Sequence, residues 1–241
     1  VKSYAMGDTT VYALNHLTVS FEKGKFTSIV GPSGSGKSTL MNVLGCLDRP
    51  TSGEYILEGK NIARYTDDEL AHTRNARIGF VFQSFNLFAN MSVLENCMIG
   101  QQKVLKRPRE EARACAMNYL ERVGMAPYIN AKPRQISGGQ KQRLAIARAL
   151  VKKAPVYIFD DSFSALDFKT DAKLRRALTK YTENAVVLIV AQRVSTIMNA
   201  EQIIVLDEGK IVGKGTHKEL LKTCPEYREI AESQLSKEEL A

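Results

Sequence analysis

A glycine-rich loop constrains the fold of this chain more than any other feature of its sequence. It lies in residues 26–39, FTSIVGPSGSGKST, where a short apolar run is followed by glycines and then by Lys-Ser-Thr. The apolar run is β-branched and bounded by glycines, which predicts a buried strand. Gly31, Gly34 and Gly36 let the backbone turn so that successive N–H groups converge on one anion, and the next helix adds its positive dipole. The loop therefore predicts a phosphate-binding site.

The loop fits the pattern G-x-x-x-x-G-K-[ST], in which the lysine reaches the β- and γ-phosphates and the next hydroxyl binds Mg²⁺. The simpler interpretation is a glycine turn before a helix. The pattern would arise by chance in a chain of this length on the order of 1% of the time, so other parts of the chain must supply its partners. The residues expected to contact the nucleotide are Ser33, Gly34, Ser35, Gly36, Lys37, Ser38 and Thr39, with Ser38 also a metal ligand.

Composition predicts a globular chain without a membrane span or a nucleic-acid partner. With 241 residues, 44% of them apolar, the chain can bury a real core as one domain, 1–241. No apolar run approaches the ~18 residues of a spanning helix, so a membrane role requires a partner. Four scattered cysteines favour a reduced cytosolic setting. The net charge of +8 is spread among acids and lacks interleaved aromatics, which argues against nucleic acid.

The first part of the chain predicts strands around the glycine-rich loop. Residues 11–21 alternate late in the run and predict a hairpin leading into the loop. A second strand pair is expected on either side of a turn at Gly59. Asp67 is expected to cap a short helix before a strand at 77–82, which ends at Gln83.

The character then changes to consecutive helices over residues 84–151. Residues 92–95, Ser-Val-Leu-Glu, form a capping box, and Pro108 with Gly124 brackets a helix that carries an apolar stripe. Alternation of strand and helix then returns. The pattern predicts an α/β fold with a mostly parallel central sheet and a helical insertion. The later strands are expected at 156–160, 185–190, 202–206 and 210–213.

Two further segments carry candidate chemistry. The strand 156–160 ends in Asp160, which would place a carboxylate near Mg²⁺, although strands ending in aspartate are common. The segment 136–143, ISGGQKQR, has a serine and two glycines opening a helix, which predicts a second anion-binding helix N-terminus. The simpler interpretation is an ordinary helix start with Ser137 as its cap.

Together these motifs resemble the ATP-binding cassette (ABC) ATPases along nearly the whole chain. The resemblance rests on GPSGSGKST, Gln83 at a strand end, ISGGQKQR, VYIFDD, Ser-Ala-Leu-Asp and Gln-Arg in this order. It implies a RecA-like P-loop NTPase core with an antiparallel β subdomain, and a head-to-tail dimer that holds two nucleotides at its interface. The implied divisions are a core with the β subdomain at 1–83 and 152–215, a helical subdomain at 84–151 and a C-terminal helical tail at 216–241.

The resemblance also implies roles for individual residues. Tyr4 would stack on adenine, although a core tyrosine is nearly as good an interpretation. Gln83 would touch Mg²⁺ and the attacking water and signal to a membrane partner, and Asp160 would hold Mg²⁺ through its water shell. The signature residues, which act on the neighbouring subunit's ATP, are Ser137, Gly138, Gly139 and Gln140, and the loop between the two sites is Ser164, Ala165, Leu166 and Asp167.

Two positions depart from the family pattern, and both concern hydrolysis. Asp161 stands where the family has a glutamate that polarises the attacking water, which withdraws the carboxylate by roughly 1.5 Å. A misplacement of that size can cost about a hundredfold in rate. Gln192 replaces the family's switch histidine, and an amide cannot carry a proton. These changes resemble the degenerate site of heterodimeric exporters and predict tight ATP binding with slow hydrolysis.

The two halves of the chain resemble different subfamilies. Residues 1–135 are similar to macrolide-export and lipoprotein-release cassettes, and residues from 136 onward are similar to cassettes of multidrug exporters, as in a composite. The leading hypothesis is an ATPase subunit that drives transmembrane transporter domains from the cytoplasmic face of the membrane, as a homodimer or heterodimer. The alternative is a dimerisation switch with little hydrolysis. Soluble relatives in translation or DNA repair carry two cassettes or a long coiled coil and fit poorly.

Overall fold

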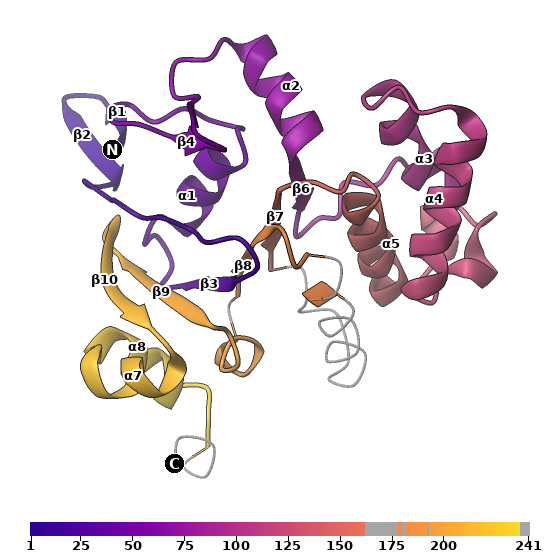
Figure 1. The fold of residues 1–241 in the computed structure, drawn as a ribbon. Helices are drawn as coiled ribbons and strands as arrows, with labels where there is room; N and C mark the ends of the chain where they lie inside the picture. The colour runs from indigo at the N-terminus through magenta and orange to yellow at the C-terminus, as the bar shows by residue number, and fades with distance from the viewer. Residues whose placement is uncertain (162–177, 180–181, 192, 237–241) are drawn as a thin grey trace. The chain divides into compact units, whose positions relative to one another are not determined.

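The computed structural model describes residues 1–161, 178–179, 182–191 and 193–236, which belong to two compact units (Figure 1). The first unit contains Val1–Arg74 and Val186–Ala241, and the second contains Asn75–Ala185. The glycine-rich loop lies in the first unit. Gln83, the signature segment and the Asp160–Asp161 pair lie in the second. Each unit is described by itself.

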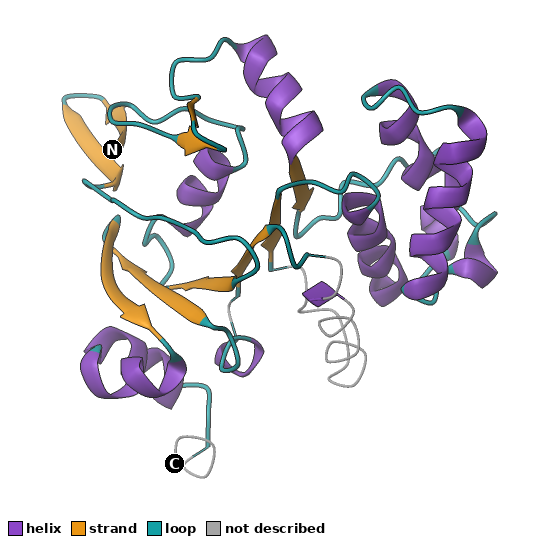
Figure 2. Cartoon of the chain, viewed as in Figure 1, coloured by secondary structure: helices purple, strands orange, loops and turns teal. Residues whose placement is uncertain are grey.

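The first unit contains a mostly parallel sheet with the order β10-β9-β3-β8. The central strand β3 (Phe26–Val30) pairs in parallel with β8 (Val186–Val190) on one side and β9 (Gln202–Asp207) on the other, and β10 (Lys210–Gly215) runs antiparallel to β9. Most residues of β3, β8 and β9 are buried, as expected for apolar strands that are covered on both faces. The predicted parallel sheet is confirmed (Figure 2).

Two antiparallel strand pairs accompany this sheet. They are β1 (Lys2–Met6) with β2 (Thr9–Leu14), and β4 (Ile56–Leu57) with β5 (Lys60–Asn61) around the predicted turn. The predicted hairpin at 11–21 is wrong, because β2 pairs backward with β1 and residues 15–25 form no strand. The alternating apolar side chains there are half-buried, but their backbone does not pair with any strand in the described part of the chain.

Helices α1 (Lys37–Leu44) and α2 (Asp67–Arg77) follow the loop and the second strand pair. The predicted cap of α2 is wrong by one residue. Thr66 is the cap, since its hydroxyl accepts from the Glu69 amide at 3.3 Å while the Glu69 carboxylate accepts from the Thr66 amide at 2.7 Å. This reciprocal pair satisfies two backbone donors, which a cap at Asp67 would not do. At the chain's end, α7 (His217–Thr223) packs on β10 and α8 (Pro225–Glu232) on β9.

The second unit combines a parallel strand pair with a helical bundle. Strands β6 (Ile78–Val81) and β7 (Val156–Asp160) pair in parallel, and the helices α3 (Val93–Lys103), α4 (Arg109–Arg122) and α5 (Gly138–Leu150) pack on one another. The predicted capping box at 92–95 and the helix between Pro108 and Gly124 are confirmed. Short 3-10 turns occur at Ala126–Tyr128, Pro133–Gln135 and, in the first unit, Val194–Thr196. Within the described part of the chain, no helix has the length and apolar character needed to cross a membrane.

Candidate functional site

The glycine-rich loop connects the buried strand β3 to the N-terminus of α1 in the first unit. Gly36 has a φ of 99°, and a Cβ there would lie 2.3 Å from the carbonyl oxygen of Ala13, so only glycine fits. Gly31 makes an equally close approach to the backbone of Leu206. A turn at Gly209 supports the loop, because its amide donates to the Ser35 carbonyl at 3.1 Å. The conformation of the loop is therefore determined by close contacts with the backbone of the segments on both sides of it.

The donors of this loop fit a phosphate chain. Gly36 occupies the N-cap of α1 and no side chain caps the helix among the described residues, so the first amides of α1 are available to an anion. The Lys37 ammonium donates to the carbonyl oxygens of Gly31 at 2.9 Å and Pro32 at 2.6 Å, inside the loop that precedes it. Burial lowers the pKa of Lys37 below its usual value. A negative group in the loop would favour the charged form of this lysine.

Tyr4 lies on β1 in the same unit and is 42% exposed. The alternative that it is a core tyrosine is therefore wrong. Its hydroxyl donates to a carboxylate oxygen of Asp48 at 3.1 Å. Burial, followed by the bond to Asp48, raises the pKa of Tyr4. The Tyr4 hydroxyl is thus tied to the segment that follows α1, the helix that begins at the predicted phosphate site.

The second unit brings together Gln83, Asp160 and Asp161. Asp160 ends β7, and the Gln83 amide donates to a carboxylate oxygen of Asp161 at 3.4 Å. Asp161 has a φ of 43°, a left-handed conformation that is uncommon for a residue other than glycine. Burial and then the neighbouring charge of Asp161 raise the pKa of Asp160. Two adjacent carboxylates and an amide oxygen form a donor set that suits a hard cation such as Mg²⁺.

Ser137 caps α5, as the simpler interpretation of the signature segment required. Its hydroxyl accepts from the Gln140 amide at 3.3 Å, and the Gln140 side chain accepts from the Ser137 amide at 2.7 Å. Ser137 and Gly138 remain exposed at the N-terminus of a helix of 13 residues. The cap therefore does not exclude an anion-binding role, because the helix dipole still faces solvent.

Some expected residues lie outside the described part, and others were missed. Gln192 and the loop of Ser164, Ala165, Leu166 and Asp167 fall outside the described residues. No sequence pattern indicated a role for Arg148, whose guanidinium donates to the carbonyls of Phe85 at 2.7 Å and Asn86 at 2.6 Å. It thereby fixes the stretch that follows Gln83, where both residues have positive φ.

Comparison with known proteins identifies relatives of this chain. The model of the ABC transporter family matches residues 14–164. The chain is 40% identical over 217 residues to the uncharacterized ABC transporter ATP-binding protein MJ0796 of Methanocaldococcus jannaschii, covering 87% of this chain and 92% of that protein. It is 38% identical over 227 residues to the macrolide export ATP-binding/permease protein MacB of Hyphomonas neptunium, covering 93% of this chain. The chain spans 35% of that MacB's length.

The solved structures that this chain resembles belong to the same family as its sequence relatives. A dimeric structure of the cassette MJ0796 in a post-hydrolysis state, bound to ADP and Pi, matches with a TM-score of 0.83 and 38% identity, over 89% of this chain and 95% of that one. A bacterial Atm1-family ABC exporter with ATP bound matches with a TM-score of 0.82 and 29% identity, over 98% of this chain and 41% of that one.

Proposed function

Because the chain belongs to the ABC transporter family, as an ATP-binding cassette, we propose that it binds Mg-ATP through residues 31–39 and hydrolyses the nucleotide slowly. The observation that carries this proposal is the loop itself. Its glycines are required by close backbone contacts, Lys37 lies inside it, and the amides of α1 lack a capping side chain. These features are those of a phosphate-binding loop.

The proposal assigns roles to the residues of each unit separately. In the first unit, residues Ser33 to Thr39 hold the phosphates, Lys37 neutralises their charge, and Ser38 supplies a hydroxyl to Mg²⁺. In the second unit, Asp160 holds the water shell of Mg²⁺, and Gln83 orients the attacking water. The metal would supply charge neutralisation at the phosphoryl group. Ionised Asp160 would be favoured near such a cation, which opposes the rise that burial causes in its pKa.

The signature segment is proposed to act on the nucleotide of a neighbouring cassette. This assignment explains why the described part of the chain has helix N-termini suited to anions both at Lys37 and at Gly138. The MJ0796 cassette has been solved as a dimer, which supports a dimeric arrangement, as homodimer or heterodimer. The permease part of MacB supports a transmembrane partner, with the cassette on the cytoplasmic face.

Slow turnover is proposed from Asp161 and Gln192. The carboxylate of Asp161 is one methylene shorter than the family's glutamate, and it already accepts a hydrogen bond from Gln83. A double change, Asp161→Glu with Gln192→His, should raise the ATPase rate well over tenfold. An unchanged rate would contradict the assignment of both residues. The same observation supports the alternative of a dimerisation switch, and the basal turnover of the purified chain distinguishes the two.

Calorimetry tests the proposal directly. The purified chain should bind Mg-ATP, and Lys37→Met should lose this binding while it keeps the helical signal of the parent. A well-folded parent chain without affinity for ATP and magnesium would refute the proposal.

A further inference from the structure

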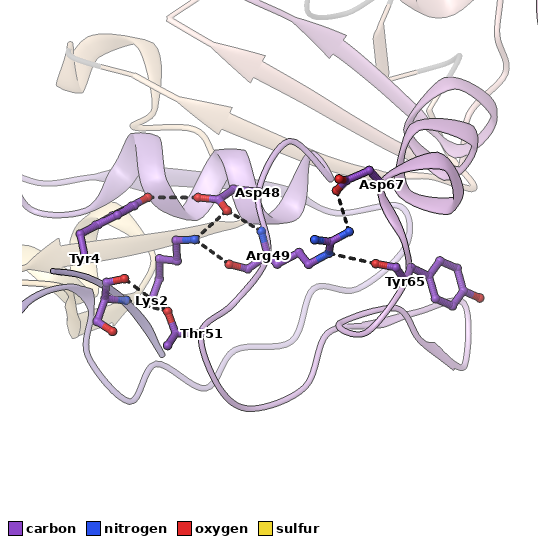
Figure 3. A network of polar contacts seen from close by, with 8 residues as sticks. Lys2, Tyr4, Asp48, Arg49, Thr51, Tyr65 and Asp67 are labelled. Atoms are coloured by element: carbon purple, nitrogen blue, oxygen red, sulfur yellow. Dashed lines mark hydrogen bonds and ion pairs between the residues drawn. The ribbon is translucent and has the colours of Figure 1, made fainter.

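The phenol of Tyr4 forms one end of a polar network in the first unit (Figure 3). Both carboxylate oxygens of Asp48 are used. One accepts from the Lys2 ammonium at 2.6 Å and from the Arg49 amide at 2.7 Å, and the other accepts from the Tyr4 hydroxyl at 3.1 Å. Lys2 also donates to the Arg49 carbonyl at 2.9 Å. Asp48 is therefore the common acceptor that joins β1 to the segment after α1.

The same network restrains the aromatic ring as well as the hydroxyl. The Lys2 ammonium lies 5.0 Å from the centroid of the Tyr4 ring, within the range of a cation–π contact. A tyrosine that is 42% exposed on a two-stranded hairpin would otherwise sample several rotamers, since little packing holds it. Here Lys2 restrains the ring, and Asp48 restrains the hydroxyl.

We propose that Asp48 and Lys2 are positioning residues that hold the Tyr4 ring ready to stack on the base of a bound nucleotide. The inference rests on the proposed function, because it requires a nucleotide whose phosphates occupy the loop at 31–39. It goes further by separating two contributions to affinity. The loop recognises the triphosphate, and the Asp48 network determines how much the base adds.

The physical reason is preorganisation. A mobile tyrosine loses rotamer freedom when a base stacks on it, and this loss reduces the affinity. Asp48 removes most of that freedom before the nucleotide arrives. Partial burial acts to raise the pKa of Asp48, but bonds from Lys2, the Arg49 amide and Tyr4 outweigh burial and lower it. Asp48 is consequently ionised at neutral pH and accepts all three donors at once.

A second branch of the network provides a matched control. The Arg49 guanidinium donates to the Tyr65 carbonyl at 2.9 Å and to the Asp67 carboxylate at 2.6 Å. The Asp67 side chain is 94% exposed and forms no hydrogen bond or ion pair with Tyr4 or Lys2 in the described part of the chain. Removing its carboxylate changes the net charge as the loss of Asp48 does, but it leaves the acceptor of the Tyr4 hydroxyl in place.

The test compares Mg-ATP with inorganic tripolyphosphate, which has no base. Asp48→Ala and Tyr4→Phe should each weaken Mg-ATP binding about three- to tenfold, the range expected when one side chain must be newly ordered. Both variants should bind tripolyphosphate within about twofold of the parent chain. Asp67→Ala should bind both ligands as the parent does. Tyr4→Phe retains the ring and makes the test independent of how well Asp48→Ala folds.

A double variant tests whether Asp48 acts through the phenol. In the Asp48→Ala background, Tyr4→Phe should have less effect on Mg-ATP binding than it has alone, because the bond is already lost. Full additivity would overturn the inference, as would unchanged ATP affinity in either single variant. Equal weakening for ATP and tripolyphosphate would also overturn it, since that result indicates a structural role. Failure of the parent chain to bind either ligand would instead refute the proposed function.

Discussion

Two glutamines of the second unit are equally buried but differ in their hydrogen bonds, so replacing each of them should change the stability of the chain in opposite directions. Gln101 on α3 and Gln142 on α5 both have 0% exposure. The Gln101 amide donates to the carbonyls of Cys97 and Ala112, each at 3.0 Å, and accepts from Arg107 at 2.6 Å. Neither polar atom of the Gln142 amide has a hydrogen-bond partner in the described part of the chain. We expect replacement by methionine to stabilise the chain at 142 and destabilise it at 101.

The magnitudes follow from these contacts. A buried polar atom without a partner costs about 1 to 3 kcal/mol, so Gln142→Met should raise the free energy of unfolding by about that amount. Gln101→Met loses a bond from a charged donor and leaves the Ala112 carbonyl without its side-chain partner, which should lower the free energy by about 2 to 4 kcal/mol. Methionine and glutamine have similar helix propensities and similar lengths, so neither effect comes from the helix itself.

Urea denaturation followed by the helical circular dichroism signal measures both values. The midpoint should move upward for Gln142→Met and downward for Gln101→Met, with the slope of the transition unchanged in each. A lower midpoint for Gln142→Met would refute the reasoning, because it would show that this amide is satisfied in the folded chain. An unchanged midpoint for Gln101→Met would refute the expected contribution of its three hydrogen bonds to stability.

Three further predictions follow from the described residues. Gly36→Ala should lower the urea midpoint more than Gly34→Ala does. Both positions have positive φ, but only a Cβ at position 36 would meet the Ala13 carbonyl. Equal losses of stability would show that this close contact does not matter. Ser137→Ala should lower the free energy of unfolding by about 1 kcal/mol, because the helix loses its capping hydroxyl. The same variant should form less ATP-driven dimer in gel filtration, while its affinity for Mg-ATP stays unchanged. Burial lowers the pKa of His217 below its ordinary value of about 6.5, so protonation favours the unfolded chain. The free energy of unfolding should therefore fall as the pH drops through about 6.5. His217→Gln should flatten this fall, measured as urea midpoints between about pH 7 and pH 5.

The sequence predicted those parts of the fold that depend on local patterns. The strand, glycine loop and helix around Lys37 are adjacent in the chain, and so are the residues of the capping box at 92–95 and the cap at Ser137 with its helix. A buried apolar run similarly predicted β7 and its terminal Asp160. Each of these signals lies within a few residues and has a direct physical cause.

The parts that were missed depend on contacts between distant residues. Asp48 and Lys2 are 46 positions apart, and a single aspartate after a helix gives no sign that it will accept a tyrosine hydroxyl. Arg148 lies on an amphipathic helix, where an arginine usually indicates a solvated face, yet it binds carbonyls at Phe85 and Asn86. The false hairpin at 11–21 has the same origin, because alternation does not specify which strand a segment will pair with.

The position of β3 has a consequence for how the protein is made. Its partners β8 and β9 begin at Val186 and Gln202, so a nascent chain that has been translated through Thr39 contains the complete phosphate motif but neither of the strands that flank it. The turn at Gly209, which holds the Ser35 carbonyl, is synthesised later still. On the ribosome, nucleotide capture should therefore begin only after most of the polypeptide has emerged, and ATP cannot act as an early folding template.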